Sequence, residues 1–183
     1  MAWRLIPVDS LAPTPWKNGG GTTREVLKFP PDSTLDTFDW RISLASVATS
    51  GPFSLFPQID RTLLVTDGAG IELESLALTP SDEPFSFPGE RPYHATLIDG
   101  PIADFNVMTR RTRYAHSVHR RRAAATSTGR GHIRAIVSLS EDLTCSIGGA
   151  AVALGRLDIL VIDGKESAAL AAPDWLEVEI AKL

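Results

Sequence analysis

The sequence predicts an all-β fold, either a barrel or a double-sheet sandwich. Short segments alternate apolar and polar residues with a period of two, as in residues 38–45, where Phe38, Trp40, Ile42 and Leu44 are separated by smaller or polar residues. Nearly all of these segments are bounded by Gly, Pro, Asp or Ser, which favour turns. No long stretch has a helical period, and 13 prolines scattered along the chain disfavour long helices. These observations together indicate two packed β layers.

In chain order, the same alternation predicts strands at residues 3–8, 23–29, 38–45, 61–66, 71–78, 94–98, 103–109, 113–118, 133–139, 143–147, 152–154, 157–162 and 176–180. Between them, residues 51–57 read Gly-Pro-Phe-Ser-Leu-Phe-Pro, a rigid loop whose phenylalanines we expect to plug one end of a barrel. Residues 123–129, Ala-Ala-Ala-Thr-Ser-Thr-Gly, are typical of an exposed linker.

Two β lobes are expected within the 183 residues. An apolar strand followed by Asp-Gly occurs twice, at residues 61–68 and 159–164, which is a weak internal repeat. We therefore predict an N-terminal lobe at residues 1–112 and a C-terminal lobe at residues 113–183, with the second lobe free to share strands with the first.

Composition favours a cytoplasmic protein. Apolar residues make up 43% and charged residues 22% of the chain, as in ordinary globular proteins. The N-terminus lacks the pattern of a secretory signal, and no apolar run reaches bilayer length, so no membrane partner is expected. The single cysteine, Cys145, suits a reducing compartment and is interpreted as a buried apolar residue.

Charge is distributed unevenly along the chain. The net charge is −4, yet the segment from Arg110 to Arg134 holds eight of the 18 basic residues and no acid. Such a block can bind nucleic acid, but a dedicated nucleic-acid domain is usually basic overall and this chain is not. We interpret the segment as a solvated basic face, and nucleic acid is a disfavoured partner.

Metal and nucleophile signatures are missing from the sequence. The four histidines do not form a His-x-His pair, and His116 and His119 are three apart in a predicted strand, which places them on opposite faces. Neither a Gly-x-Ser-x-Gly elbow nor a phosphate-binding loop is present. We therefore expect no metal and no cofactor, and no catalytic residue is assigned.

Residues 15–25 form an unusual segment, Pro-Trp-Lys-Asn-Gly-Gly-Gly-Thr-Thr-Arg-Glu. Three successive glycines cost backbone entropy, so they are kept where the chain must turn tightly or approach something closely. Asn-Gly is itself a turn signal. We predict a tight turn with exposed amides, flanked by Lys17 and Arg24.

A set of polar residues is suited to holding a small anion. The planar guanidinium of arginine binds a carboxylate through two parallel hydrogen bonds, and asparagine both donates and accepts. Because they are two apart in a predicted strand, Asp104, Asn106 and Met108 should share one face. An alternative stays open, in which Arg41 and Asp104 form a buried structural ion pair and Asn18 only makes the turn. The candidate ligand-binding residues are Lys17, Asn18, Arg41, Ser43, Arg61, Asp104, Asn106 and Met108, with Arg24 close by in sequence.

These motifs, in this order, resemble the HutD/Ves family: residues 15–25, Trp-Arg-Ile-Ser-Leu-Ala at 40–45, the loop at 51–57, Asp-Arg-Thr at 60–62 and Asp-Phe-Asn-Val-Met-Thr-Arg-Arg at 104–111. The resemblance covers residues 3–111. It implies a cupin-like (RmlC-like) bicupin of two jelly-roll lobes without the histidine metal motif, associated with bacterial histidine utilisation. The positions that match the family signature are Trp16, Lys17, Asn18, Gly19, Trp40, Arg41, Ser43, Arg61, Asp104, Asn106 and Met108.

The resemblance and the arginines together predict a metal-independent binder of a small carboxylate, such as urocanate or a formylglutamate-like molecule, with a regulatory or accessory role. The alternative is an enzyme, a lyase, isomerase or hydrolase, in which Asp104 or Lys17 transfers a proton. A nucleic-acid-binding regulator that uses the basic segment is the third and weakest hypothesis. A homodimer is left open.

Overall fold

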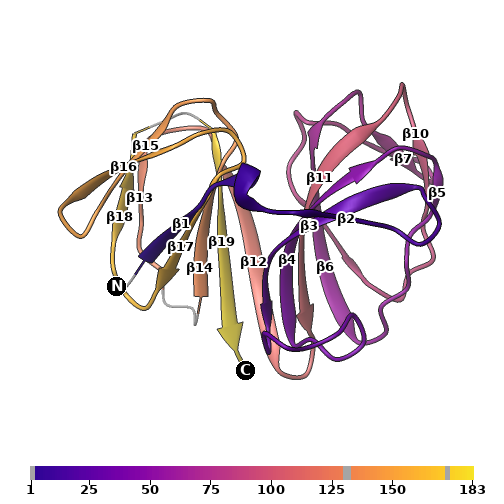
Figure 1. Ribbon diagram of the computed structural model, residues 1–183, viewed down its shortest axis with the longest axis horizontal. Helices are drawn as coiled ribbons and strands as arrows, with labels where there is room; N and C mark the ends of the chain where they lie inside the picture. The colour runs from indigo at the N-terminus through magenta and orange to yellow at the C-terminus, as the bar shows by residue number, and fades with distance from the viewer. Residues whose placement is uncertain (1–2, 130–132, 172–173) are drawn as a thin grey trace. The chain divides into compact units, whose positions relative to one another are not determined.

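The computed structural model describes residues 3–129, 133–171 and 174–183, and apart from one short 3-10 turn, η1 (Val8–Ser10), its regular elements in these ranges are β-strands (Figure 1). The chain forms two compact units. The N-terminal unit is Ala12–Tyr114, and the C-terminal unit combines Met1–Leu11 with Ala115–Leu183. The prediction of an all-β chain is confirmed.

Two antiparallel sheets make up the N-terminal unit. The first has the strand order β2-β3-β4-β11-β6-β9 and the second has the order β5-β10-β7-β8. The strands are β2 (Pro13–Pro15), β3 (Gly21–Phe29), β4 (Trp40–Val47), β5 (Gly51–Pro52), β6 (Ile59–Asp67), β7 (Ile71–Leu73), β8 (Leu76–Leu78), β9 (Phe85–Pro88), β10 (His94–Leu97) and β11 (Ile102–Arg110).

The core of this unit is formed by inward-facing residues of both sheets. Leu63 and Val65 of β6 pack with Ile71 and Leu73 of β7, and all four are at most 2% exposed. Alternate residues of a strand point to the same side, so the period of two in the sequence is the direct source of this core. Gly68, with φ +87°, makes the turn by which the chain leaves the first sheet for the second.

The C-terminal unit repeats this arrangement with the sheets β1-β17-β14-β19-β12 and β13-β18-β15-β16. Its strands are β1 (Trp3–Ile6), β12 (Tyr114–Arg121), β13 (Ala125–Ser127), β14 (Ile133–Ser138), β15 (Leu143–Ile147), β16 (Ala150–Leu154), β17 (Ile159–Asp163), β18 (Ala168–Leu170) and β19 (Trp175–Lys182). Cys145 is a fully buried core residue here, as predicted, beside Trp175 and Ile136. Gly164, with φ +85°, follows β17 as Gly68 follows β6.

The first strand of the chain belongs to the C-terminal unit. β1 pairs antiparallel with β17, and Trp3 lies opposite Ile162. The unit therefore takes strands from both ends of the sequence. The predicted boundary between two lobes, 1–112 and 113–183, stays a prediction. In each unit the described strands form two separate sheets, as in a jelly-roll sandwich, rather than one closed barrel.

Two local predictions were wrong. The expected linker at residues 123–129 contains β13, which pairs with β18 through Ser127 and Ala168. The segment 71–78 is two strands, because Glu74 adopts φ +57° and turns the chain so that Ile71 lies opposite Leu78. Within the described ranges, no helix has the length and apolar character that a membrane crossing requires.

Candidate functional site

Six of the predicted site residues share one face of the first sheet of the N-terminal unit. On β11, Met108 lies opposite Arg41 of β4 and Arg61 of β6. Two residues along, Asn106 lies opposite Ser43, and directly paired residues of antiparallel strands project to the same side. Asp104 is two residues before Asn106 on β11, so it projects to the same face. The residues of this face are Arg41, Ser43, Arg61, Asp104, Asn106 and Met108.

Three of these residues are joined by hydrogen bonds. Arg61 Nη2 donates to Asn106 Oδ1 at 3.1 Å, and Asn106 Nδ2 donates to Asp104 Oδ1. All three residues are buried, with exposed fractions of 7%, 5% and 3%. The amide of Asn106 has a donor end and an acceptor end, so it can link a buried cation to a buried carboxylate without direct contact between them.

Aromatic rings surround the guanidinium of Arg61. Its Cζ lies 5.2 Å from the ring centroid of Phe53, 5.5 Å from that of Phe56 and 5.0 Å from that of Phe87. A guanidinium over an aromatic face is attracted by the ring quadrupole. Nη1 also donates to the carbonyl of Ser54 at 3.3 Å, whereas Nε is buried and has no partner in the part of the chain that the structure describes. Phe53 and Phe56 also pack against the core, as predicted for the loop at 51–57.

Burial shifts the pKa at both charged ends of this hydrogen-bonded chain. The pKa of Asp104 is raised to about 7, mainly because burial disfavours the carboxylate, while the charge of Arg61 and the bond from Asn106 oppose the shift. The pKa of Arg61 is lowered to about 10, again mainly through burial, with Asp104 opposing and the like charge of Arg41 adding to it. The site thus holds a cation that stays charged and a carboxyl group poised near neutral pH.

Arg41 forms its ion pair with Glu25, not with Asp104. Arg41 Nε donates to Glu25 Oε2 at 3.2 Å, and Lys28 Nζ lies 3.2 Å from Glu25 Oε1. The open alternative of an Arg41–Asp104 structural pair is therefore not what the structure shows. Glu25 and Lys28 are site residues that sequence reasoning missed, because a β-bulge brings them to this face.

Lys17 and Asn18 lie away from Arg41. They sit in the turn between β2 and β3, and Gly21, at the start of β3, lies opposite Val47 at the far end of β4. Val47 is six positions along the strand from Arg41, which is about 20 Å. Asn18 Oδ1 accepts the backbone N–H of Gly20 at 3.0 Å, so this side chain stabilises the turn.

The other signature residues have structural contacts. Trp16 Nε1 donates to Thr23 Oγ1 at 2.7 Å, and its ring covers Gly21, where a Cβ would lie 3.1 Å from the nearest ring atom. Gly19 has φ +72°, which explains a glycine at that turn position. Trp40 stacks on Phe29 with 5.9 Å between the ring centroids. Arg24 lies opposite Leu44, one residue out of phase with Ser43, and so faces away from the site.

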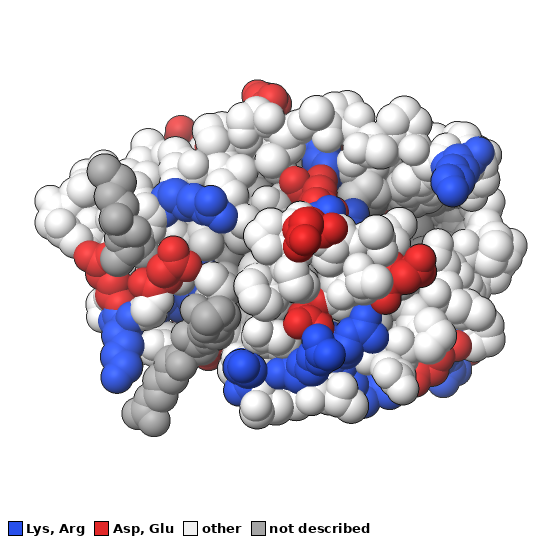
Figure 2. Space-filling model, turned by 60° about the horizontal axis from the view of Figure 1, so that its bottom comes forward, with Lys and Arg blue, Asp and Glu red and all other residues white. Residues whose placement is uncertain are grey.

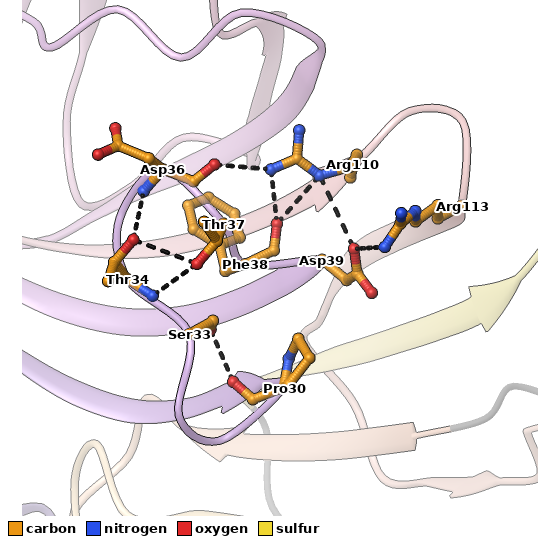
Figure 3. Close-up of polar contacts among 9 residues, drawn as sticks. All are labelled: Pro30, Ser33, Thr34, Asp36, Thr37, Phe38, Asp39, Arg110 and Arg113. Atoms are coloured by element: carbon orange, nitrogen blue, oxygen red, sulfur yellow. Dashed lines mark hydrogen bonds and ion pairs between the residues drawn. The ribbon is translucent and has the colours of Figure 1, made fainter.

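Most arginines of the predicted basic face are paired with acids or with backbone carbonyls. On the face drawn in Figure 2, basic side chains lie beside acidic ones. Arg110 donates to the carbonyls of Asp36 and Phe38, and Arg113 Nη1 donates to Asp39 Oδ1 at 2.9 Å (Figure 3). The further pairs in this segment are Arg111 with Asp60 and Glu90, Arg120 with Asp174, and Arg121 with Glu177. Arg134 is 2% exposed, so the interpretation of a solvated basic face was wrong for it, and Arg130 lies outside the described residues.

The C-terminal unit has a separate polar depression of about 250 Å³ that the sequence did not indicate. It is lined by Ser117, His119, Arg121, Thr126, Thr128, Gly129, Glu177 and Glu179. Among the residues that the structure describes, no group of three or more His, Cys, Asp or Glu side chains converges as a metal site would require.

Comparisons with known proteins agree on one family. The HutD family model matches residues 9–177. Protein Ves of Cronobacter sakazakii is 39% identical over 129 residues, which are 67% of this chain and 70% of that protein. Protein Ves of Citrobacter koseri is 43% identical over 115 residues, and there the match spans 60% of this chain and only 56% of the relative.

Solved structures extend the similarity to the whole chain. HutD from Pseudomonas fluorescens has a TM-score of 0.87 at 27% identity and covers 100% of both chains. A conserved protein of unknown function from Pseudomonas aeruginosa has the same TM-score at 29% identity, with 98% of each chain covered. A cupin 2 conserved barrel domain protein from Leptotrichia buccalis, at a TM-score of 0.59 and 11% identity over 98% of this chain and 96% of that one, shares the fold alone. The prediction of a cupin-like fold is confirmed.

Proposed function

Because this chain belongs to the HutD family, we propose that its N-terminal unit binds a small carboxylate metabolite without a metal and serves a regulatory or accessory role in histidine utilisation. The ligand class is that of urocanate and formylated glutamate. We place this role in the cytoplasm, where Cys145 stays a thiol.

One observation carries the proposal: two buried guanidinium groups flank the same residue. Arg41 and Arg61 lie opposite Met108 from its two sides, and because a guanidinium only donates hydrogen bonds, neither can offset the charge of the other. Like charges held this close repel, and the charge of Arg41 contributes, after burial, to the lowered pKa of Arg61. A carboxylate bound between them would remove this repulsion and gain charge-assisted hydrogen bonds.

Both arginines keep donors that such a ligand can use. The Nε of Arg61 is buried and has no hydrogen-bond partner among the described residues, and a buried unpaired donor is costly until something accepts from it. Arg41 uses Nε for Glu25, while its two Nη atoms form no hydrogen bond with any described residue. These donors have the planar arrangement that a carboxylate matches.

Calorimetric titration with urocanate and with N-formylglutamate tests the proposal. We expect the wild type to bind at least one of them, and Arg41→Gln to weaken binding by at least tenfold, since a charge-assisted bond contributes about 1.5–3 kcal/mol. Arg91→Gln is the matched control, because Arg91 is an exposed arginine of the same unit that pairs with Glu74. Absence of binding by the wild type, or unchanged binding by a folded Arg41→Gln protein, would overturn the proposal.

A second candidate function is supported by Asp104. Burial raises the pKa of this carboxyl group to about 7, which is where a general acid or base works best. An enzyme of the same site would use Asp104 for proton transfer on the bound metabolite. Mass spectrometry after incubation with the two compounds discriminates the functions: conversion that is lost in Asp104→Asn would identify an enzyme, and full recovery of both compounds would leave a binder.

A further inference from the structure

Glu25 stands between two cations at the open side of the site. Its Oε2 accepts from Arg41 Nε and its Oε1 pairs with Lys28 Nζ, each at 3.2 Å. The side chain of Glu25 is 38% exposed, compared with 10% for Arg41 and 25% for Lys28. Glu25 is thus the most exposed of these three charged side chains.

A β-bulge places Glu25 in this position. Glu25 lies opposite Ser43 and Lys28 lies opposite Arg41, and the register shifts between Glu25 and Leu27. Residues three apart in a regular strand point to opposite faces. The extra residue, Val26, is buried and absorbs the difference, so both charged side chains reach the face that carries Arg41.

We propose that Glu25 determines which carboxylates the site accepts, by receiving an N–H from the same ligand whose carboxylate binds Arg41. The ligand class is therefore a carboxylate that also carries an N–H donor, and plain carboxylates are disfavoured. This inference rests on the proposed function, because it concerns the same site.

The chemistry of the carboxylate group supports this role. Each oxygen of Glu25 has one cationic partner and two lone-pair directions, so each can accept a further donor. A plain carboxylate at Arg41 would face the negative charge of Glu25 with nothing to offset the repulsion. A ligand N–H directed at Glu25 replaces that repulsion with a charge-assisted hydrogen bond.

Matched ligand pairs test the inference by calorimetry. Urocanate is compared with 3-(furan-2-yl)acrylate, in which a ring oxygen replaces the N–H, and N-formylglutamate is compared with glutarate, which lacks the formamide. At about pH 8 the imidazole of urocanate is neutral and keeps a single N–H. We expect the wild type to bind at least one N–H compound roughly tenfold more tightly than its partner, the difference between having and lacking one charge-assisted bond.

Glu25→Gln keeps the shape and one acceptor oxygen but removes the charge. We expect it to reduce the preference severalfold and to tighten binding of the plain carboxylate, because the repulsion is gone. If Glu25 only positioned Arg41, Glu25→Gln would weaken both members of a pair equally, and that result overturns the inference. Arg91→Gln is the control: Arg91 is an exposed arginine of the same unit that pairs with Glu74, and its replacement should leave the preference in place.

The outcomes separate this inference from the proposed function. If the wild type binds none of the four compounds, both fail. If it binds both members of each pair with equal affinity, the carboxylate site stands and the role of Glu25 is refuted. A preference that survives in Arg91→Gln and falls in Glu25→Gln supports both.

Discussion

Arg41 and Arg61 flank Met108 on the two strands next to β11, and each of the two arginines is less than one-tenth exposed. The two arginines differ in their other contacts. Arg61 is enclosed by aromatic rings and linked inward to Asp104 through Asn106, whereas Arg41 pairs with Glu25 at the more exposed edge. Arg61 therefore lies on the aromatic side of the site, and Arg41 lies on the side where Glu25 is 38% exposed.

The buried carboxyl group of Asp104 should make stability depend on pH. The unfolded chain releases this proton near the ordinary aspartate pKa of 3.8, whereas in the folded protein the pKa is about 7. Between these values the folded state binds more protons, so the contribution is full below about pH 4 and is lost as the pH rises through 7. Asp104→Asn should remove this pH dependence of the free energy of unfolding, which amounts to at most about 4 kcal/mol between the two pKa values. Urea unfolding of both proteins at several pH values measures it, and identical slopes would contradict the assignment.

Removal of the Arg61 charge should destabilise the protein most at high pH. Arg61→Met fills part of the aromatic surroundings but leaves Asp104 buried without its cation, at a cost of about 3 kcal/mol when the carboxylate is charged. Below the pKa of Asp104 the cost should shrink. The double variant with Asp104→Asn should recover stability at about pH 8, measured by urea unfolding. A loss that is independent of pH, with no recovery in the double variant, would show that packing alone is responsible.

Gly21 should not tolerate a side chain. A Cβ there would lie 2.3 Å from the carbonyl oxygen of Ser46 and 3.1 Å from the Trp16 ring, so Gly21→Ala should cost about 1–3 kcal/mol. Gly51→Ala is the control, because a Cβ at Gly51 has no heavy atom within 4 Å. Denaturant midpoints compare the two variants. Equal stability of the two variants would contradict the close packing around Gly21.

The ion pair of Arg120 with Asp174 should contribute more to stability than an exposed pair. Two hydrogen bonds of 2.8 and 2.7 Å join the side chains, and the side chain of Arg120 is 8% exposed. Arg120→Gln should cost about 1–3 kcal/mol, because it leaves Asp174 without its partner. Arg91→Gln breaks the exposed pair with Glu74 and should cost less than about 1 kcal/mol. Thermal unfolding distinguishes the two, and equal losses would contradict this ranking.

Much of the fold could be predicted from the period of two. The strands β4, β6 and β11 are rich in apolar residues, so their existence follows from the sequence, but both faces of each strand are buried, so the inward face does not. β13, with the sequence Ala-Thr-Ser, has no large apolar residue, and its pairing with β18 depends on a partner that is distant in sequence. A strand of that kind is defined by tertiary pairing, which local propensity does not encode.

The site could be predicted only in part, for similar reasons. Asp104, Asn106 and Met108 share a face because they are two apart in one strand, and the structure agrees. The bulge that adds Glu25 has no clear local signal. The roles of Lys17 and Asn18 depend on where a turn lies along the sheet, which the spacing of residues cannot give.

The central claim is that a carboxylate binds between Arg41 and Arg61, and the Nε–H resonances of the arginine side chains in ¹H–¹⁵N NMR spectra test it most directly. On titration with urocanate or N-formylglutamate, the Arg61 Nε–H, which has no partner within residues 3–129, 133–171 and 174–183, should shift and saturate together with that of Arg41, while that of Arg91 stays unchanged. Shifts absent at Arg41 and Arg61, or equally large at Arg91, would contradict the claim.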